Sequence, residues 1–298
     1  NYVMNLKKLY FILILSLLTV WAYCGNMTFC VLDVGQGLCC AVISPDRHCM
    51  VFDCGSVGSK KNPSNSAPYK YALAPYLKEN GIKKIDYLVL SHPNTDHYSG
   101  FPDLVSNYPI GTYIKNGFSS SSVTYNELQK SLAKKKLKAQ VAKSGRVFSL
   151  GIGVKCTVLA PFGGKATGSD NDQSVMIRLV YGNTSFLLSG DATAYEERQL
   201  VRIFGKSLAS SVLLCGHHGS KYSTCLDFLA KVKPKAALIS CGQNNSYGHP
   251  AKDTLDRLNR IKCKVYRTDR DGSVTIISDG KKLTVKKGKK ADKNKFKF

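Results

Sequence analysis

The sequence is poor in acidic residues: 20 Asp and Glu stand against 43 Lys and Arg, and the formal net charge is +23. Residues 281–298 hold nine lysines and one aspartate, so most of the excess charge lies on the rest of the chain. A field of this sign attracts polyanions such as nucleic acid, an anionic membrane surface or an acidic polysaccharide. The alternative is a lysine-rich surface that serves only solubility. The charge alone favours nucleic acid by a small margin.

Long hydrophobic runs are also scarce. The apolar stretch near the N-terminus, residues 9–20, follows Lys7 and Lys8 and precedes small residues that end at Gly25. This order is typical of a secretory signal peptide, predicted at residues 1–25, and the stretch is short for a membrane-spanning helix. We therefore expect a secreted protein without membrane contact beyond the signal peptide. The alternative is an uncleaved N-terminal helix that anchors the chain.

The 11 cysteines include no C-x-x-C pair, which argues against a structural zinc knuckle. In an exported chain this many cysteines suggest disulfides, although the sequence does not say which of them pair. Cys39, Cys40, Cys156 and Cys215 lie in strand-like runs, where a buried free thiol is the alternative.

No Pro/Gly/Ser-rich linker divides the chain. Strand-like and helix-like runs alternate through both halves, so the sequence predicts one domain, at residues 26–280. Residues 281–298 have too little apolar content to pack, and a disordered lysine-rich tail is predicted there.

The strongest chemical signal is a loop that follows a short apolar run. Ile85–Leu90 reads as a buried strand, and Pro93 and Asn94 prevent it from continuing. The loop, residues 91–100, reads Ser-His-Pro-Asn-Thr-Asp-His-Tyr-Ser-Gly and presents His92, Asp96 and His97. Neutral imidazole and carboxylate are the ligands that suit zinc, manganese or iron.

Further short motifs accompany this loop. They are residues 32–37 (Leu-Asp-Val-Gly-Gln-Gly), 53–55 (Asp-Cys-Gly), 171–174 (Asn-Asp-Gln-Ser), 188–191 (Leu-Ser-Gly-Asp), 216–220 (Gly-His-His-Gly-Ser), 247–250 (Tyr-Gly-His-Pro) and 268–272 (Thr-Asp-Arg-Asp-Gly). In this order they resemble the metallo-β-lactamase superfamily, and more narrowly the extracellular metallo-hydrolase domain of the ComEC/Rec2 family of competence proteins. The resemblance runs from about Met27 to about Ser278. It implies a mixed α/β (α+β) fold, the four-layer αββα sandwich, with a metal site at one edge.

The sequence departs from the family pattern in three respects. Asn94 stands where the superfamily loop has its middle histidine, and Leu38 replaces the aspartate of the family's Gly-Gln-Gly-Asp. Nothing in the sequence encodes the multi-spanning channel of the competence proteins. We therefore expect the hydrolase module alone, in an exported form.

The resemblance implies one or two divalent metal ions, Zn²⁺ or Mn²⁺, with Mg²⁺ as a further possibility. One ion would be held by Asp96, His97, Asp191 and a member of the histidine pair 217–218, for which we favour His217. Asp191 would bridge to a second ion held by His92. At that second site Asp172 is the expected replacement for a missing histidine, because Asn94 offers only a neutral amide oxygen.

The remaining polar residues receive secondary roles. His249 and His218 are candidates to donate to a phosphoryl oxygen or to protonate the leaving group, with Asp96 counted among the catalytic residues as well. A purely turn-forming role for His249, between Gly248 and Pro250, is the alternative. For Asp33 and Asp53 we expect capping or loop bracing.

Together the charge and the metal motif predict a secreted phosphodiesterase, a DNase that hydrolyses DNA with a metal-activated hydroxide. DNA is the expected partner, and no stable protein partner is predicted. One alternative keeps the chemistry on a small substrate, as in a phosphorylcholine esterase. The other is a secreted DNA-binding module without catalysis. No aromatic-basic pattern for stacking single-stranded bases stands out.

Overall fold

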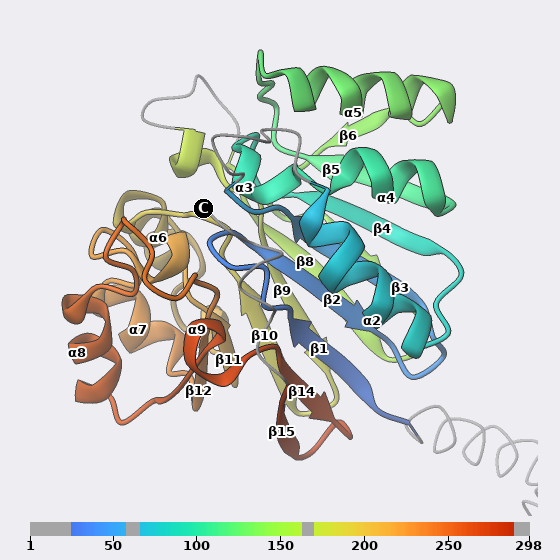
Figure 1. Ribbon diagram of the computed structural model, residues 1–298. Coiled ribbons are helices and arrows are strands. Elements are labelled where there is room, and N and C mark those ends of the chain that lie inside the picture. Colours follow the sequence, from blue (N-terminus) through green and yellow to red (C-terminus); the bar gives the residue numbers. More distant parts are fainter. Residues whose placement is uncertain (1–24, 58–65, 163–169, 289–298) are drawn as a thin grey trace, which may run out of the picture.

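Two mixed β-sheets lie face to face in this computed structural model, which describes residues 25–57, 66–162 and 170–288 (Figure 1). The predicted signal peptide, residues 1–25, lies outside the described residues except for Gly25. Among the described segments, no helix combines the length and the apolar character needed to cross a membrane.

In the described chain, the first sheet has the strand order β15-β14-β1-β2-β3-β4-β5-β6. Its strands are β1 (Met27–Val31), β2 (Cys39–Ile43), β3 (Cys49–Cys54), β4 (Ile85–Leu90), β5 (Ile110–Lys115), β6 (Ala139–Val141), β14 (Val274–Ser278) and β15 (Leu283–Lys287). The strands from β15 to β3 pair antiparallel, and those from β3 to β6 pair parallel. The parallel strands therefore all end at one edge of this sheet.

The second sheet has the order β13-β12-β11-β10-β9-β8-β7 in the described residues. Its strands are β7 (Val147–Ser149), β8 (Val154–Ala160), β9 (Met176–Tyr181), β10 (Thr184–Leu188), β11 (Val212–Leu214), β12 (Ala236–Ile239) and β13 (Lys264–Arg267). The strands from β10 to β13 run parallel, and those from β7 to β10 antiparallel.

The core between the sheets follows from the two-residue period of the strands. In β1, Met27, Phe29 and Val31 face the second sheet, whereas Cys30 faces the opposite side. Phe29 meets Phe186 of β10 edge to face, with ring centroids 5.7 Å apart. One apolar core thus joins the two sheets.

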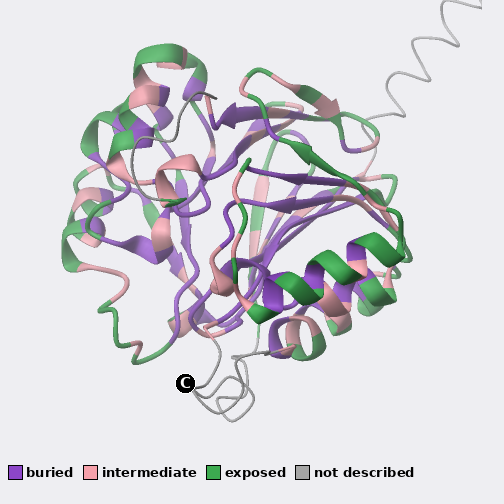
Figure 2. Ribbon diagram, turned by 90° about the horizontal axis from the view of Figure 1, so that it is seen from above, coloured by how far each residue is buried: buried purple, intermediate pink, exposed green. Residues whose placement is uncertain are grey.

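Helices cover both outer faces, with their exposed sides turned to solvent (Figure 2). On the first sheet they are a π-helical turn η1 (Pro68–Leu73), α2 (Ala74–Glu79), α3 (Thr95–Tyr98), α4 (Phe101–Asn107) and α5 (Val123–Lys134). On the second sheet they are α6 (Ala194–Phe204), α7 (Leu226–Val232) and α8 (Lys252–Arg260), with α9 (Thr268–Asp271) next to β13. Short 3₁₀ turns are η2 (Asp170–Gln173), η3 (Gly205–Leu208) and η4 (His217–Gly219). The predicted αββα sandwich is confirmed.

Disorder was predicted for residues 281–298, and this is wrong at the start of that segment. Leu283–Lys287 forms β15, which pairs antiparallel with β14 over its whole length. Leu283 and Val285 pack against the core between the sheets, while alternate residues stay exposed. Two apolar side chains at strand spacing suffice here, because the edge of β14 supplies the backbone hydrogen bonds.

The disulfide prediction is also wrong within the described chain. The ten described cysteines are all buried free thiols. Burial raises the pKa of the Cys30 thiol to about 12, so this group stays protonated and packs as a small apolar side chain. The alternative of buried thiols, given above for Cys39, Cys40, Cys156 and Cys215, is the one observed.

Candidate metal centre

The loop after β4 carries the first ligands. Asn94 has an extended backbone and α3 begins directly after it, so Asp96 and His97 project from the first turn of a short helix. His92 and His97 are completely buried. Their burial places two imidazoles in the junction between the sheets, where an unpaired polar atom is costly.

Asp191 comes from the end of β10 in the other sheet. The turn before it needs Gly190, which has a φ of +52° and lies so close to the first sheet that a Cβ there would meet the Ser91 Cβ at 2.7 Å. The Asp191 amide donates to the Ser174 hydroxyl (3.1 Å). The two sheets therefore bring Asp191 against the His92–His97 loop.

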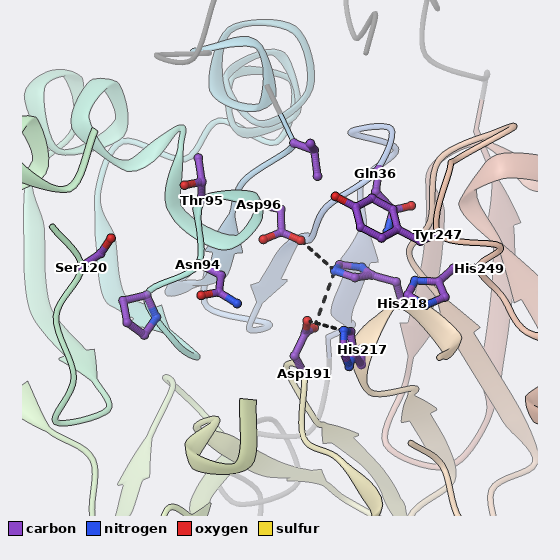
Figure 3. A pocket seen from close by; sticks show the side chains of 12 residues that line it. Gln36, Asn94, Thr95, Asp96, Ser120, Asp191, His217, His218, Tyr247 and His249 are labelled. Carbon is purple, nitrogen blue, oxygen red and sulfur yellow. Dashed lines mark hydrogen bonds and ion pairs between the residues drawn. The ribbon is translucent and has the colours of Figure 1, made fainter. Parts of the chain in front are cut away.

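His217 and His218 follow β11 and adopt an uncommon backbone. Both have positive φ, 51° and 54°, a conformation that strains residues with a side chain. The His218 Nδ1 lies 3.0 Å from the Ser240 carbonyl, to which it donates, and this leaves Nε2 directed at Asp96. Adjacent histidines thereby send their rings to different sides of Asp191 (Figure 3).

Four side chains converge on one point: Asp96, His97, Asp191 and His218, whose ligand atoms lie within 4.8 Å of one another. The His97 Nε2 is 3.2 Å from the Asp191 Oδ1, and the His218 Nε2 is 3.2 Å from the Asp96 Oδ2. Two imidazole nitrogens and two carboxylates form a ligand set that suits a divalent transition metal.

The second oxygen of Asp191 faces a second pair of imidazoles. Its Oδ2 lies 3.7 Å from the His217 Nε2 and 4.0 Å from the His92 Nε2, while Oδ1 faces His97 and His218. Asp191 thus stands between two imidazole pairs, as expected for a carboxylate shared by two cation sites.

Unpaired atoms show that the residues fit a cation. The His92 Nε2, the His97 Nε2 and the Asp191 Oδ1 are buried and make no hydrogen bond. Groups this deeply buried are normally paired, so these three atoms point to a positive ion among them. The side chains present therefore match a divalent metal.

Burial and the neighbouring charges act in opposite directions on the pKa values of Asp96 and His97 in this cluster. Burial alone would raise the pKa of Asp96, but the adjacent His97 and His218 lower it to about 2. Burial would likewise lower the pKa of His97, but Asp191, Asp96 and Asp53 raise it well above its usual value. The pKa of His92 falls to about 3, because burial and the charge of His97 lower it by more than Asp191 and Asp96 raise it. The carboxylates are therefore ionised and His92 is neutral near pH 7.

The cluster opens into a cavity of about 450 Å³. Asp96, Asp191 and the two histidines of η4 form part of its wall, and Tyr247, His249 and Gln36 continue it on the side of the histidines (Figure 3). The His217 side chain is 28% exposed and that of His218 only 3%, so His217 is the more accessible of the pair.

Comparison with known proteins agrees with this geometry. The family model described as the metallo-beta-lactamase superfamily matches residues 32–243, which is more than half of the chain. The chain belongs to the metallo-β-lactamase superfamily. Among curated relatives, the superfamily domain is 29% identical to "ComE operon protein 3" of Bacillus subtilis over 82% of this chain and 32% of that protein. It is 31% identical to "Competence protein ComA" of Neisseria gonorrhoeae, over 81% of this chain and 31% of that protein.

A third relative is "Recombination protein 2" of Haemophilus influenzae, at 32% identity over 82% of this chain and 28% of that protein. This metallo-β-lactamase chain thus spans about a third of the length of the curated relatives it matches. Among solved structures, the metallo-beta-lactamase fold protein YhfI of Bacillus subtilis is similar with a TM-score of 0.50 and 12% identity, over 81% of this chain and 96% of that chain. That likeness concerns the fold.

Within this superfamily domain the expected role of His217 needs correction. His218 joins Asp96, His97 and Asp191, whereas His217 faces the other oxygen of Asp191. The sequence shows two adjacent histidines but not the positive φ of each, and those angles decide which ring points inward.

The positions of Asp172 and Asn94 also differ from expectation. The Asp172 carboxylate accepts a hydrogen bond from the Thr193 hydroxyl and is not part of the ligand cluster. Asn94 lines the cavity and donates through its amide to Asn171 (3.2 Å), whose own amide lies 3.5 Å from the His217 Nδ1. Asn171 therefore takes the place near the second pair of imidazoles that was expected for Asp172.

Asp53 braces the ligand loop, as expected from the sequence, and it also contacts His97, which the sequence did not indicate. It is fully buried, accepts from the Ser91 amide (2.7 Å) and hydroxyl (2.6 Å), and lies 2.8 Å from the His97 Nδ1. A carboxylate behind a ligating histidine fixes the ring and directs its other nitrogen at the metal.

The Gly-Gln-Gly motif braces the ligand loop from behind. A Cβ on Gly37 would meet the carbonyl of Gly55 at 2.3 Å and that of Asp96 at 2.8 Å. The neighbouring Leu38 donates its amide to the Asp96 carbonyl (3.0 Å) and buries its side chain in the core. Leu38, a departure from the family pattern, thus has a packing role that an aspartate would not fill.

The chain after the histidine pair is held by a buried acid on α6. Glu197 accepts hydrogen bonds from the amides of Thr224 (2.6 Å) and Cys225 (2.8 Å). Burial raises the pKa of Glu197 to about 7, although these two amides act in the opposite direction. Because this folded-state pKa lies above the usual value of 4.5, the stability contributed by the protonated acid is present at low pH.

We expect that contribution to be lost as the pH rises from about 4.5 through 7, by at most about 3 kcal/mol. Glu197→Gln cannot ionise, so its unfolding free energy relative to the wild type should increase over the same interval. Urea unfolding of both proteins in chelator, at pH 5 and pH 8, measures the difference. A difference that stays constant with pH would show that Glu197 is ionised throughout.

Proposed function

We propose that this metallo-β-lactamase domain is a secreted, metal-dependent phosphodiesterase that hydrolyses DNA. The observation that carries the proposal is Asp191, placed between the imidazoles of His97 and His218 on one side and those of His92 and His217 on the other. Divalent cations held there would lower the pKa of water and neutralise charge on phosphoryl oxygens. An arrangement of this kind suits displacement at phosphorus.

The basic character of the chain supports a polyanionic substrate. The net charge of +23 favours phosphate-rich ligands, and the names of two relatives refer to competence or recombination. Both observations favour DNA over an uncharged ester. Export through the N-terminal signal predicted from the sequence belongs to the same proposal.

His249 is the proposed contact to the phosphoryl group. Its ring lies 5.6 Å from that of His217 and 6.3 Å from that of His218, between centroids, and its Nδ1 is buried without a hydrogen bond. Burial lowers the pKa of His249 to about 4, and the charges of His218 and His217 add to the effect. Because it is neutral near pH 7, His249 serves as a hydrogen-bond donor to phosphoryl oxygen rather than as an imidazolium acid. His218 and Asp96 act in this scheme as ligands.

Tyr247 is the proposed platform for the base next to the scissile phosphate. Its side chain lines the cavity, is 58% exposed, and stacks on His249 with ring centroids 5.8 Å apart. Stacking of a base on an aromatic ring is worth about 1–3 kcal/mol. We expect Tyr247→Ala to raise KM for single-stranded DNA about fivefold to tenfold, and Tyr247→Phe to leave it unchanged.

An abasic substrate provides the control for Tyr247. When the nucleotide that meets the ring has no base, wild type and Tyr247→Ala should have equal KM values. If Tyr247→Ala is impaired to the same extent on the abasic strand, the ring supports the cavity wall and does not stack a base.

A small-substrate esterase is the second candidate, and the cavity favours it. A volume of about 450 Å³ is typical of sites for small molecules. An esterase of this kind should show little salt dependence, whereas an enzyme that neutralises many phosphates loses affinity steeply as salt increases.

The test is cleavage of linear double- and single-stranded DNA without metal and with added Mn²⁺, Mg²⁺ or Zn²⁺, for the wild type and for Asp191→Ala. Metal-dependent cleavage that Asp191→Ala abolishes would support the proposal. Salt-sensitive DNA binding without cleavage under any metal would favour the non-catalytic binding module. Absence of both would favour the esterase.

A further inference from the structure

A second groove lies at the end of the sandwich away from the metal centre. Its volume is about 630 Å³, and four lysines line it together with polar and aromatic groups. Those lysines are Lys235, Lys264, Lys281 and Lys282. Tyr266 forms part of the wall, with the Nζ atoms of Lys264 and Lys287 5.6 Å and 5.7 Å from its ring centroid.

The groove is built from the starts of the parallel strands. Ala236 and Lys264 begin β12 and β13, and Thr184 begins β10, whereas the metal ligands follow the ends of β10 and β11. The Lys264 amide donates to the Lys235 carbonyl (3.1 Å), so these two lysines are neighbours in the sheet. The β14–β15 turn adds Lys281 and Lys282 from the other sheet; in Figure 1 this hairpin lies at the bottom and α3 near the top.

The two sites are far enough apart to act on different parts of one polymer. The chain runs from Thr184 in the groove along β10 to Leu188, which at about 3.3 Å per residue is roughly 13 Å, and the turn to Asp191 at the metal centre lies beyond that end. A nucleic acid carries a phosphate at every nucleotide, so a strand of several nucleotides covers this distance.

The charge of the groove is of one sign. Among its described lining residues none is acidic, and the four lysines form no ion pair with a described carboxylate. The carboxylates nearest in sequence are engaged elsewhere: Asp227 pairs with Arg198 (3.8 Å) and Asp269 with Arg267 (2.5 Å), and Asp279 accepts from the amides of Lys281 and Lys282.

We propose that this lysine groove, defined by Lys235, Lys264, Lys281 and Lys282, binds the phosphate backbone of nucleic acid as a docking site separate from the metal centre. The inference rests on the proposed function and deepens it: the groove would bind the substrate, and the metal centre would cleave it. Polymer held at the groove raises the local concentration of phosphodiesters at the metal centre.

Nucleic acid fits the groove better than a membrane does. The groove is concave, and its aliphatic lining residues, Ala236, Leu283 and Val285, pack into or against the core between the sheets. The large apolar side chains that are exposed in the described chain, such as Tyr195, Ile203 and Leu226, do not line it. A peripheral membrane surface combines basic residues with exposed apolar side chains that enter the lipid. A groove with ammonium groups on its walls matches a row of phosphates instead.

The test compares two variants with the same loss of charge. The groove variant replaces Lys235, Lys264, Lys281 and Lys282 by glutamine; the matched control replaces four exposed lysines in and after α5, which are Lys130, Lys134, Lys135 and Lys138. Binding of a 30-nucleotide strand is measured in chelator across a salt series, so that no cleavage occurs. The groove variant should bind at least about tenfold more weakly, and its salt slope should fall by up to roughly 3, since each phosphate contact contributes about 0.7 on single strands.

A short substrate shows whether the groove substitutions affect catalysis at the metal centre itself. Metal-dependent turnover of bis(p-nitrophenyl) phosphate, which cannot reach from the metal centre to the groove, should be the same in the groove variant and the wild type. Equal losses of DNA binding in both lysine variants would overturn the proposal, since binding would then follow net charge. Loss of binding to phosphatidylserine vesicles with unchanged DNA binding would overturn it in favour of a membrane contact. If the proposed nuclease function is wrong but the groove proposal is right, the groove variant will still bind DNA more weakly than the control variant, and no metal will support cleavage.

Discussion

Replacing Asp191 by asparagine is expected to abolish tight metal binding and to reduce metal-dependent turnover by roughly a thousandfold or more. The Asp191 oxygens face two imidazole pairs, so the change removes the one negative charge that both pairs share. Metal-derived stabilisation of a transition state is worth several kcal/mol, and each 1.4 kcal/mol corresponds to about a factor of ten in rate. Calorimetric titration with Mn²⁺ and Zn²⁺, together with turnover of a chromogenic phosphodiester, measures both effects.

Asp172→Asn is the matched control for Asp191→Asn. It makes the same chemical change in the same region, but at a carboxylate that accepts from the Thr193 hydroxyl and is not in the ligand cluster. Metal affinity in this variant should stay within a few-fold of the wild type. If Asp172→Asn were as damaging as Asp191→Asn, Asp172 would be a ligand after all, as the sequence had indicated.

The sequence predicted those parts of the metal centre that are local in the chain. Asp96 and His97 are adjacent on the turn after β4, and any strand that ends at Pro93 presents them together. Asp191 was placed by its motif at the end of β10, and Ile85–Leu90 was predicted as a buried strand with the bounds that β4 has. Strand ends and turn residues depend on near neighbours, which is why these predictions hold.

The errors concern features that depend on distant parts of the chain. Which ring of His217 and His218 points inward depends on two positive φ angles, which close packing of Gly219 against Pro250 and Ile239 helps to hold. Asp172 was favoured as an anionic ligand, but the approach of α6 supplies the Thr193 hydroxyl that binds it. Neither fact is visible in a local pattern.

The lysine-rich C-terminal segment and the cysteines illustrate a further reason. Composition predicts disorder for Leu283–Lys287, yet a strand at the edge of a sheet needs only a partner with free backbone groups and one apolar face. The cysteine count suggested bridges because export was expected, but the ten described thiols are buried and free, even where Cys39 lies opposite Cys54 on the neighbouring strand. Composition describes the whole chain, whereas pairing depends on the neighbours of each residue.

The contact of Asp53 with His97 could have been predicted if the order of the strands in the sheet had been known. In the structure β3 and β4 are parallel neighbours with Phe52 opposite Val89, so the residues that follow each strand meet at the same edge. Asp53 and the Ser91–His97 loop are therefore in contact, although nearly forty residues separate Asp53 from Ser91 in the sequence. A carboxylate directly after a buried strand was the available signal.

The resulting prediction is that Asp53→Asn weakens metal binding about 10- to 100-fold without preventing folding. An amide oxygen can still accept from the Ser91 amide, so much of the loop geometry is retained. The amide nitrogen, however, would favour a lone pair on the His97 Nδ1 and thus a proton on Nε2, the atom that faces Asp191. Metal binding would then have to overcome the wrong tautomer of the ring.

Asp86→Asn separates this effect from a general loss of stability. Asp86 accepts from the Cys49 amide (2.9 Å) and so braces the same pair of strands at the opposite end, away from the cluster. Both variants should lower the unfolding free energy in chelator by about 1–3 kcal/mol, the usual result when a buried hydrogen-bonding group loses its partner. Only Asp53→Asn should shift a competitive Zn²⁺ titration against a chromogenic chelator. Equal shifts in the two variants would mean that Asp53 acts by stiffening the strands, whereas a shift confined to Asp53→Asn identifies it as the residue that sets the His97 tautomer.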